Sequence, residues 1–378
     1  MKGSVLKKFL CTCLVTAAAF AATTISASAC TTIYVGGDLV EEGTPFVART
    51  EDYGSDYNKL WFISESGKWK QGDHYVGCPE YGPFEWDFTH DSYRFTYFTN
   101  DIYYDGICPE CGEKADHYSY TEFGTNEKGV SVSATETLYG NEKVTEADPY
   151  RDAEWAEANK SERIGIEETD IPTIILAEAS SAREGVKLLL DIYENYGCVY
   201  ASGVFICDKD EVWYIENCSG TQYVAIKLND NMIFLEPNMA VIGRVDLDDE
   251  NVIASKDLIA VAKKAGTFIG DEAKNIIDFR ASYARISEKM DQRMIDGLNY
   301  LNATYKYDSD ALVADNTKFT ISNLDASDKL VALYTNIKAD RKLDKDDVFG
   351  YYKLSSIGKA SNQEIEIFQL FKDRTVET

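Results

Sequence analysis

The stretch S-A-S-A-C-T-T-I-Y-V-G, residues 26–36, marks the point where a leader-like segment meets the first strand of a fold. Four small residues precede Cys30, and the β-branched, alternating residues 31–36 predict a strand. A cysteine at such a boundary has three candidate roles. It is a lipid anchor, one half of a disulfide, or the nucleophile of an enzyme.

The residues before Cys30 have the pattern of a secretory signal peptide. Three lysines form a positive start, residues 9–20 are an apolar run, and A-S-A ending at Ala29 is a small-x-small cleavage site. The apolar run is too short to remain as a membrane-spanning helix. The sequence therefore predicts that residues 1–29 are a signal peptide and that the protein is exported, as an extracellular or cell-surface protein.

Length and charge limit the classes of function. The chain has 378 residues and a formal net charge of -26, which becomes about -29 once the lysines of the leader are removed. This length suffices for one large domain with an ample core. A surface of this charge repels phosphate backbones, so we expect no nucleic-acid partner.

The cysteine count fits an exported protein with a spare thiol. Cys11 and Cys13 leave with the leader, and an oxidising compartment permits disulfides among the rest. If six of the remaining seven pair, one thiol is left over, although the pairing is not readable from sequence. The seven are Cys30, Cys78, Cys108, Cys111, Cys198, Cys207 and Cys218.

The first half of the mature chain predicts a hairpin followed by an irregular region. Residues 31–36 and 45–52 read as two strands joined by a turn at 38–44. Residues 53–120 are aromatic and turn-rich, which is typical of an insertion or a long functional loop.

Regular structure resumes after residue 124, in blocks of strands and helices. Blocks of this kind favour sheets covered by helices on their outer faces. The predicted strands are 128–135, 202–207, 212–216, 223–228 and 232–235. The predicted helices are 171–179, 182–196, 256–265 and 273–300, and the tail from 328 to 372 has mixed signals.

Cys30 would be the first residue of the mature protein if the leader is cut after Ala29. A free N-terminal cysteine carries a thiol and an α-amine on one carbon, and the amine has an ordinary pKa of about 7.7–8. Part of this amine is neutral at pH 7 and is able to accept the thiol proton. Nucleophile and base would then come together without a histidine.

The predicted hairpin would bring charged residues to Cys30. An antiparallel pairing centred in the turn places Arg49, Glu51 and Asp52 beside the cysteine. A carboxylate there would hold the α-amine, and a guanidinium would favour the thiolate. The alternative is an ordinary edge hairpin with a surface ion pair.

Four sequence blocks carry a family resemblance. They are C-T-T-I-Y-V-G-G from Cys30, V-A-R-T-E-D ending at Asp52, V-S-V-S-A-T-E-T, and D-K-D-E-V-W-Y-I-E-N. These blocks resemble the dipeptidase A family of cysteine peptidases. That family belongs to the N-terminal nucleophile hydrolases and is related to penicillin V acylases and bile salt hydrolases. The resemblance implies an α+β fold, the four-layer αββα sandwich, over residues 30–378, and amide hydrolysis through a thioester acyl-enzyme.

The resemblance also implies a set of site residues. Cys30 matches the nucleophile, while Arg49 and Asp52 match the residues that set its thiolate and hold its amine. Asn238, in F-L-E-P-N, matches an oxyanion-hole asparagine, and Arg285, in S-Y-A-R-I-S, resembles a late arginine of the site. Two further residues, Thr135 and Glu136, lie in the A-T-E-T block and are candidates for substrate binding. Charge complementarity suggests that Glu136 holds the free amino group of a dipeptide.

The chain departs from the family pattern in two places. The region 53–120, with C-P-E-C, is not part of the pattern, and the chain ends at Thr378 where family members continue further. A truncated C-terminus is therefore an open expectation.

Other motifs have plain explanations. Cys108-Pro-Glu-Cys111 has the spacing of half a zinc site or of a redox pair, with His74, His90, His117 and Cys78 as further candidates. In an exported protein disulfides are favoured over zinc, so we expect no metal and no cofactor. The D-K-D at 208–210 predicts a hairpin turn, because the other ligand positions of a calcium loop are absent.

The sequence thus predicts an exported cysteine dipeptidase activated by removal of its leader. Its partners would be small peptide substrates and the signal peptidase, and a homo-oligomer stays open. An acylase of the penicillin V or bile salt type on the same fold is one alternative. The other is a lipid-anchored binding protein with an acylated Cys30.

Overall fold

The computed structural model describes residues 30–52, 58–77, 83–100, 121–135, 138–286, 291–302, 305–307, 337–339 and 342–373. The signal peptide prediction, Cys78, Cys108, Cys111, His117 and Glu136 lie outside these residues. Among the described residues, no helix combines the length and the apolar character needed to cross a membrane.

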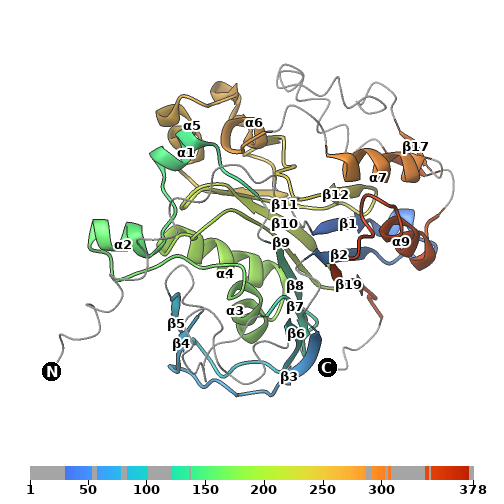
Figure 1. The fold of residues 1–378 in the computed structure, drawn as a ribbon, viewed down its shortest axis with the longest axis horizontal. Coiled ribbons are helices and arrows are strands. Elements are labelled where there is room, and N and C mark those ends of the chain that lie inside the picture. Colours follow the sequence, from blue (N-terminus) through green and yellow to red (C-terminus); the bar gives the residue numbers. More distant parts are fainter. Residues whose placement is uncertain are drawn as a thin grey trace.

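Two antiparallel sheets form the centre of the molecule (Figure 1). The smaller sheet has, in spatial order, β12 (Ile233–Glu236), β1 (Thr31–Val35), β2 (Phe46–Asp52) and β19 (Asn362–Gln369). The larger sheet has β14 (Val252–Ala254), β11 (Tyr223–Lys227), β10 (Val212–Asn217), β9 (Ser202–Cys207), β8 (Ser131–Thr135), β7 (Phe123–Asn126), β6 (Phe95–Asn100) and β3 (Lys59–Ser64).

The space between the two sheets is filled by apolar side chains from both. Phe234 of the smaller sheet packs its ring against Tyr214 and Phe205 of the larger one, with ring centroids 4.7 and 6.0 Å apart. Because side chains alternate along a strand, the neighbouring Leu235 points to the other face of its sheet, toward α7.

Helices cover the two outer faces. The larger sheet is covered by α3 (Ile171–Glu178) and α4 (Ala182–Asn195), and the smaller by α7 (Gln292–Asn302) and α9 (Lys345–Tyr352) (Figure 1). A second apolar core lies between α3, α4 and the larger sheet. The described chain therefore has the layer order helix, sheet, sheet, helix, which confirms the predicted α+β sandwich.

The remaining elements are short and lie at the periphery. The helices are α1 (Glu142–Ala147), α2 (Ala153–Asn159), α5 (Leu258–Ala265) and α6 (Phe279–Tyr283). The strands are β4 (His74–Val76), β5 (Glu85–Asp87), β13 (Arg244–Asp246), β15 (Gly270–Asp271), β16 (Ile276–Asp278), β17 (Tyr305–Tyr307) and β18 (Ile337–Ala339).

Several predicted elements are confirmed, with local reasons visible in the structure. The hairpin of β1 and β2 is confirmed, and its pairing of Thr32 with Arg49 centres it within the predicted turn. Gly36 ends β1 where a side chain would not fit, since a Cβ there would lie 2.3 Å from the Asp230 carbonyl oxygen. The D-K-D motif is a hairpin turn, in which the Asp208 carboxylate accepts two backbone N–H groups.

Two predictions about secondary structure are wrong. The single helix expected over 273–300 is divided into β16, α6 and α7. The region 53–120 is not only irregular, because residues 59–64 and 95–100 form β3 and β6 of the larger sheet. Both strands are rich in aromatic residues, which obscured the alternation of apolar and polar side chains that predicts a strand.

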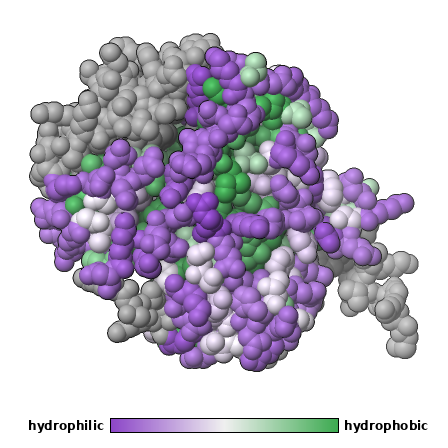
Figure 2. All heavy atoms as spheres, turned by 180° about the vertical axis from the view of Figure 1, so that it is seen from behind, coloured by the Kyte–Doolittle hydropathy of each residue, from purple (hydrophilic) through white to green (hydrophobic). Residues whose placement is uncertain are grey.

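Figure 2 shows the opposite face of the molecule, which is mostly hydrophilic with hydrophobic side chains exposed near its centre. This distribution agrees with the acidic composition of the chain.

Candidate active site

Cys30 lies directly before β1, and 7 % of its surface is exposed. The next residue, Thr31, donates its backbone N–H to the hydroxyl of Thr50 on β2 at 3.0 Å. The β1–β2 pairing therefore fixes the backbone beside Cys30. The thiol is consequently held at the end of the hairpin that the sequence predicted.

Arg49 connects the thiol to a set of polar groups. Its Nη2 donates to Cys30 Sγ at 3.3 Å and to Glu168 Oε1 at 3.4 Å. Its Nη1 lies 3.5 Å from Ser133 Oγ and 3.9 Å from Glu366 Oε1. The guanidinium is buried, with 3 % of the side chain exposed, so these interactions are little screened by water.

The groups around Cys30 shift the pKa of its thiol in opposite directions. Burial raises the pKa of Cys30 above its ordinary value, and the charge of Arg49 acts in the opposite direction. The carboxylates of Glu168 and Glu51 raise this pKa further, while the backbone N–H of Asp52 lowers it. Because the net pKa is raised, the thiol keeps its proton at neutral pH unless a base removes it.

Asp52 is the last residue of β2 and is buried. Its Oδ1 accepts a hydrogen bond from the amide of Asn362 on β19, and its Oδ2 lies 4.0 Å from Lys359 Nζ. The structure therefore brings Asp52 to the same strand end as Cys30, as the sequence predicted.

Asn238 lies in the turn after β12 and has a positive φ of 54°. Its Oδ1 accepts a hydrogen bond from Arg293 Nη1 at 2.7 Å. Its Nδ2 is buried and has no hydrogen-bond partner among the described residues. This nitrogen is a donor that a substrate oxygen could use.

Arg293, which the sequence did not single out, organises the backbone around Cys30. It lies on α7, and 6 % of its surface is exposed. Its guanidinium donates to Cys30 O at 2.9 Å, Thr31 Oγ1 at 3.1 Å, Asn238 Oδ1 at 2.7 Å, Pro237 O at 2.6 Å, and Asp291 Oδ1 and Oδ2 at 2.9 and 3.1 Å. One side chain thus ties the nucleophile to the Asn238 turn.

Arg285 lies elsewhere. It is exposed just after α6, with its guanidinium 4.5 Å from the ring centroid of Tyr139 and its backbone N–H bonded to the Tyr139 carbonyl. Within the described residues, none of its contacts involves Cys30, Arg49 or Asn238. Arg285 and Arg293 lie close together in A-R-I-S-E-K-M-D-Q-R, and no local feature of this stretch indicates which of them reaches the site.

Thr135 is the buried last residue of β8 and pairs with Gly203. On the same strand, Ser133 lies beside Arg49 and donates its hydroxyl to Glu366. Thr135 therefore lies near one end of the strand that supports the arginine.

A second cluster of charged side chains lies near Arg49 and its partners. Glu51, Glu122 and Glu364 place carboxylate oxygens within 4.8 Å of one another. The ammonium of Lys59 contacts both Glu51 and Glu122. Burial raises the pKa of Glu122 well above its ordinary value, and that of Glu364 also rises. These three residues have the geometry to hold a cation, and a lysine already supplies positive charge there.

The other described cysteines do not form disulfides. Cys198, Cys207 and Cys218 are free and buried. Burial raises the pKa of all three thiols, which makes them unreactive. The hypothesis that six cysteines pair is therefore wrong for these three.

The two described histidines have ordinary partners. His74 is exposed and bonds Asp87 at 2.8 Å. His90 bonds the backbone carbonyl of Glu178 at 3.0 Å.

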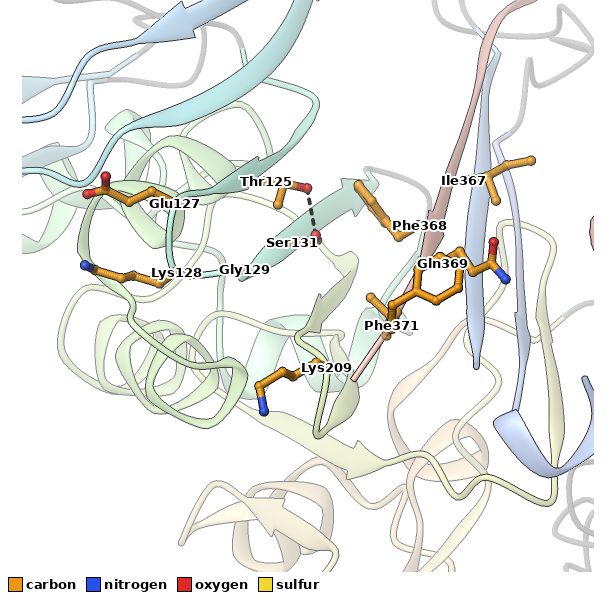
Figure 3. Close-up of a pocket in the computed structure, with 11 residues that line it drawn as sticks. Thr125, Glu127, Lys128, Gly129, Ser131, Lys209, Ile367, Phe368, Gln369 and Phe371 are labelled. Atoms are coloured by element: carbon orange, nitrogen blue, oxygen red, sulfur yellow. Dashed lines mark hydrogen bonds between the residues drawn. The ribbon is translucent and has the colours of Figure 1, made fainter. Parts of the chain in front are cut away.

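A pocket of about 520 Å³ lies at the other end of the sandwich (Figure 3). Lys128 and Lys209 line one side, and Phe368 and Phe371 line the other. Gln369, also in its lining, pairs with the first residue of β2, whereas Cys30 lies near the last. This pocket is therefore separate from the cysteine.

Comparisons with known proteins point to one family. A family model described as peptidase family C69 matches residues 29–378. Probable dipeptidase B from Streptococcus pyogenes serotype M6 is 32% identical over 304 residues, which cover 79% of this chain and 55% of that protein. A probable dipeptidase from Salmonella dublin is 32% identical over 262 residues, covering 68% and 53%. The chain spans about half the length of the curated relatives it matches.

The matches to solved structures are weak. Penicillin V acylase from Agrobacterium tumefaciens has 11% identity and a TM-score of 0.37, covering 89% of this chain and 78% of that one. A mutant of the conjugated bile acid hydrolase from Clostridium perfringens has 13% identity and a TM-score of 0.24, covering 64% and 59%.

Proposed function

The chain belongs to peptidase family C69, and from this we propose that it is a cysteine dipeptidase whose nucleophile is the thiol of Cys30. The observation that carries the proposal is the buried guanidinium of Arg49, 3.3 Å from Cys30 Sγ. The family membership and the dipeptidase relatives supply the reaction class, which is hydrolysis of an amide bond.

The thiol needs a base, because its pKa is raised by burial. We assign this role to the α-amine of Cys30 itself, freed by cleavage after Ala29. The ordinary pKa of such an amine, about 7.7–8, lets part of it accept a proton near neutral pH. Arg49 would then stabilise the thiolate that forms. Export of the protein is part of the same proposal, since removal of the leader is what creates the amine.

The reaction follows from these positions. Sulfur forms a bond to the carbonyl carbon, and the thiol proton passes through the amine of Cys30 to the leaving nitrogen. The carbon–nitrogen bond breaks, which leaves a thioester on Cys30. Water attacks the thioester, releases the acid product and returns the proton to sulfur.

Asn238 would act at the carbonyl oxygen. Its Nδ2 is a buried donor without a partner among the described residues, so it is available for the negative charge that develops during attack. Arg293 is a positioning residue, because it contacts both the Cys30 carbonyl and the Asn238 amide oxygen.

The test uses full-length protein matured by its own export route. Cys30→Ser and Cys30→Ala should lose dipeptide hydrolysis by about a thousandfold or more while keeping the circular dichroism spectrum of the wild type. Cys207→Ala, a matched change at a buried thiol, should keep most of the activity. Retention of wild-type turnover by Cys30→Ser would remove Cys30 from the mechanism.

Two measurements decide between this proposal and its alternatives. The intact mass of mature protein would reveal a lipidated Cys30, which has no free amine and would contradict the mechanism. Faster hydrolysis of penicillin V or conjugated bile salts than of dipeptides would instead assign the same nucleophile to an acylase.

A further inference from the structure

The described interior around Cys30 contains more carboxyl groups than basic groups. Its basic groups are Arg49, Lys59 and Arg293. The facing carboxyl groups belong to Glu51, Glu122, Glu168, Glu364 and Glu366. Burial raises the pKa of Glu122, Glu364 and Glu366, so protonation relieves the cost of burying these three carboxyl groups.

Glu168 is the carboxylate of this group with the closest link to the nucleophile. Arg49 Nη2 lies 3.4 Å from Glu168 Oε1 and 3.3 Å from Cys30 Sγ, so the carboxylate and the sulfur share one donor nitrogen. Glu168 lies in the turn before α3, where its backbone N–H donates to Tyr200 Oη at 3.0 Å. The turn and this bond hold the carboxylate in place.

Glu168 is also more accessible than its neighbours on the guanidinium. Its side chain is 11 % exposed, compared with 3 % for Arg49 and 2 % for Glu366. Of the two carboxylates on Arg49, Glu168 is therefore the one that a ligand can reach.

The negative charge of Glu168 disfavours the thiolate form of Cys30. Arg49 favours the thiolate, whereas Glu168 raises the pKa of the Cys30 thiol. A carboxylate in this position weakens the nucleophile until a cation compensates its charge. A cation bound at Glu168 would then allow Arg49 to stabilise the thiolate of Cys30.

A second carboxyl group, that of Glu366, lies near the same guanidinium. Glu366 contacts Arg49 Nη1 and Ser133 through its Oε1, but its buried Oε2 has no hydrogen-bond partner among the described residues. Burial raises the pKa of Glu366 well above its ordinary value, so this carboxyl group adds little negative charge beside Arg49.

We propose that Glu168 binds the α-ammonium of the substrate and thereby selects peptides with a free N-terminus. This inference rests on the proposed function, because it places the substrate carbonyl at Cys30. In a dipeptide the α-nitrogen is attached to the carbon next to the scissile carbonyl, so sulfur and ammonium meet the substrate at adjacent positions. Arrival of the ammonium would also lower the thiol pKa, which couples binding to activation of the nucleophile.

The first experiment measures binding and needs no turnover. Calorimetry on the mature Cys30→Ala protein would compare alanyl-alanine with N-acetyl-alanyl-alanine, which has the same scissile bond but no ammonium. We expect the free dipeptide to bind about ten- to a hundredfold more tightly, as a charge-assisted hydrogen bond provides. The added Glu168→Gln change should abolish this preference, and Glu154→Gln, at an exposed glutamate, should preserve it.

The outcomes separate this inference from the proposed function. Equal binding of the two peptides, or a preference that survives Glu168→Gln, overturns the role of Glu168 and leaves Cys30 as the nucleophile. Loss of the preference without any hydrolysis by the wild type would contradict the proposed function and support the ammonium site.

A second readout uses the thiol of Cys30 in full-length protein. Glu168→Gln should shift the pH profile of iodoacetamide alkylation toward lower pH, because it removes a charge that raises the thiol pKa. An unshifted profile in a folded variant counts against the proposal. If Glu168→Gln does not fold, Glu168→Asp keeps the charge and should retain part of the preference for the free dipeptide, whereas its complete loss would overturn the assignment.

Discussion

The amide oxygen of Asn238 accepts a hydrogen bond of 2.7 Å from Arg293, and this bond fixes which way the amide faces. An arginine has only donors, so it must meet the oxygen of the amide and not the nitrogen. The nitrogen is thereby left buried with no partner in the described part of the chain. Several expectations follow from this relationship and from the charges around Cys30.

Asn238→Ala should lower kcat for dipeptide hydrolysis by about 10²–10³, the usual cost of losing one oxyanion donor. Asn238→Asp keeps an acceptor for Arg293, but it replaces the donor with a carboxylate, whose negative charge also opposes the oxyanion. Its loss in steady-state kinetics should therefore be at least as large as that of Asn238→Ala. A near-normal kcat in Asn238→Asp would mean that Nδ2 does not contact the reacting oxygen.

Arg293→Met should reduce both activity and stability, because it leaves the Cys30 and Pro237 carbonyls and Asp291 without their donor. We expect a loss of about 1–3 kcal/mol in the free energy of unfolding for each buried carbonyl left without a donor. Arg285→Met is the matched comparison, and it should leave kcat within about twofold, as expected for a surface site. The reverse result, with Arg285→Met inactive, would return Arg285 to the site.

Arg49→Gln should raise the pKa of the Cys30 thiol, since it removes the nearest positive charge. The pH–rate profile of kcat/KM would then shift to higher pH, opposite to the shift expected for Glu168→Gln. Alkylation of Cys30 by iodoacetamide across pH 6–10 provides a direct check. Shifts of the same sign in the two variants would contradict the assigned electrostatics.

Asp52→Asn should lower kcat with little change in KM, because it removes a negative charge beside Cys30 while the side-chain oxygen can still accept from Asn362. The expected loss is about tenfold to a hundredfold, as for an orienting hydrogen bond near a reacting group. Unchanged turnover would remove Asp52 from the mechanism.

Stability should fall as pH rises from about 4.5 to 8. Burial raises the pKa of Glu216 to about 8 and that of Glu236 to about 7, from an ordinary value of 4.5. In this window the folded chain holds protons that the unfolded chain has released, so the free energy of unfolding decreases with pH. Each pKa unit of difference is worth about 1.4 kcal/mol.

Glu236→Gln tests this dependence, because the amide keeps an oxygen for the Met239 N–H. Thermal unfolding at pH 5 and pH 8.5 should show a smaller drop in Tm for the variant than for the wild type. Equal drops in both proteins would show that Glu236 does not take up a proton on folding.

The sequence predicted the hairpin at Cys30 because its pattern is local. Residues 31–52 contain both strands, the turn and the basic residue that meets the thiol, so the position of the turn alone indicated which residues would return beside Cys30. Asn238 was found only through the family resemblance, because nothing in F-L-E-P-N indicates a left-handed turn facing Cys30.

Glu168, Glu366 and Arg293 could not be predicted, because they reach the site from elements distant in sequence. Glu366 is an alternate residue in an acidic edge strand, N-Q-E-I-E-I-F-Q, and such residues usually face solvent. Only the pairing of β19 with β2 turns it inward beside Arg49. Tertiary placement therefore determines the charge of this site, and periodicity alone does not show it.

The pairing of β19 with β2 also has a consequence for the time at which the site can form. Asp52 and its partner Asn362 are 310 residues apart in the chain. At a synthesis rate of about 5–20 residues per second, Asp52 is made roughly 15–60 s before Asn362. During that interval Arg49 lacks Glu366 and the hairpin has an open edge. A nascent chain would therefore carry its nucleophile long before it carries the surroundings that set the reactivity of that nucleophile.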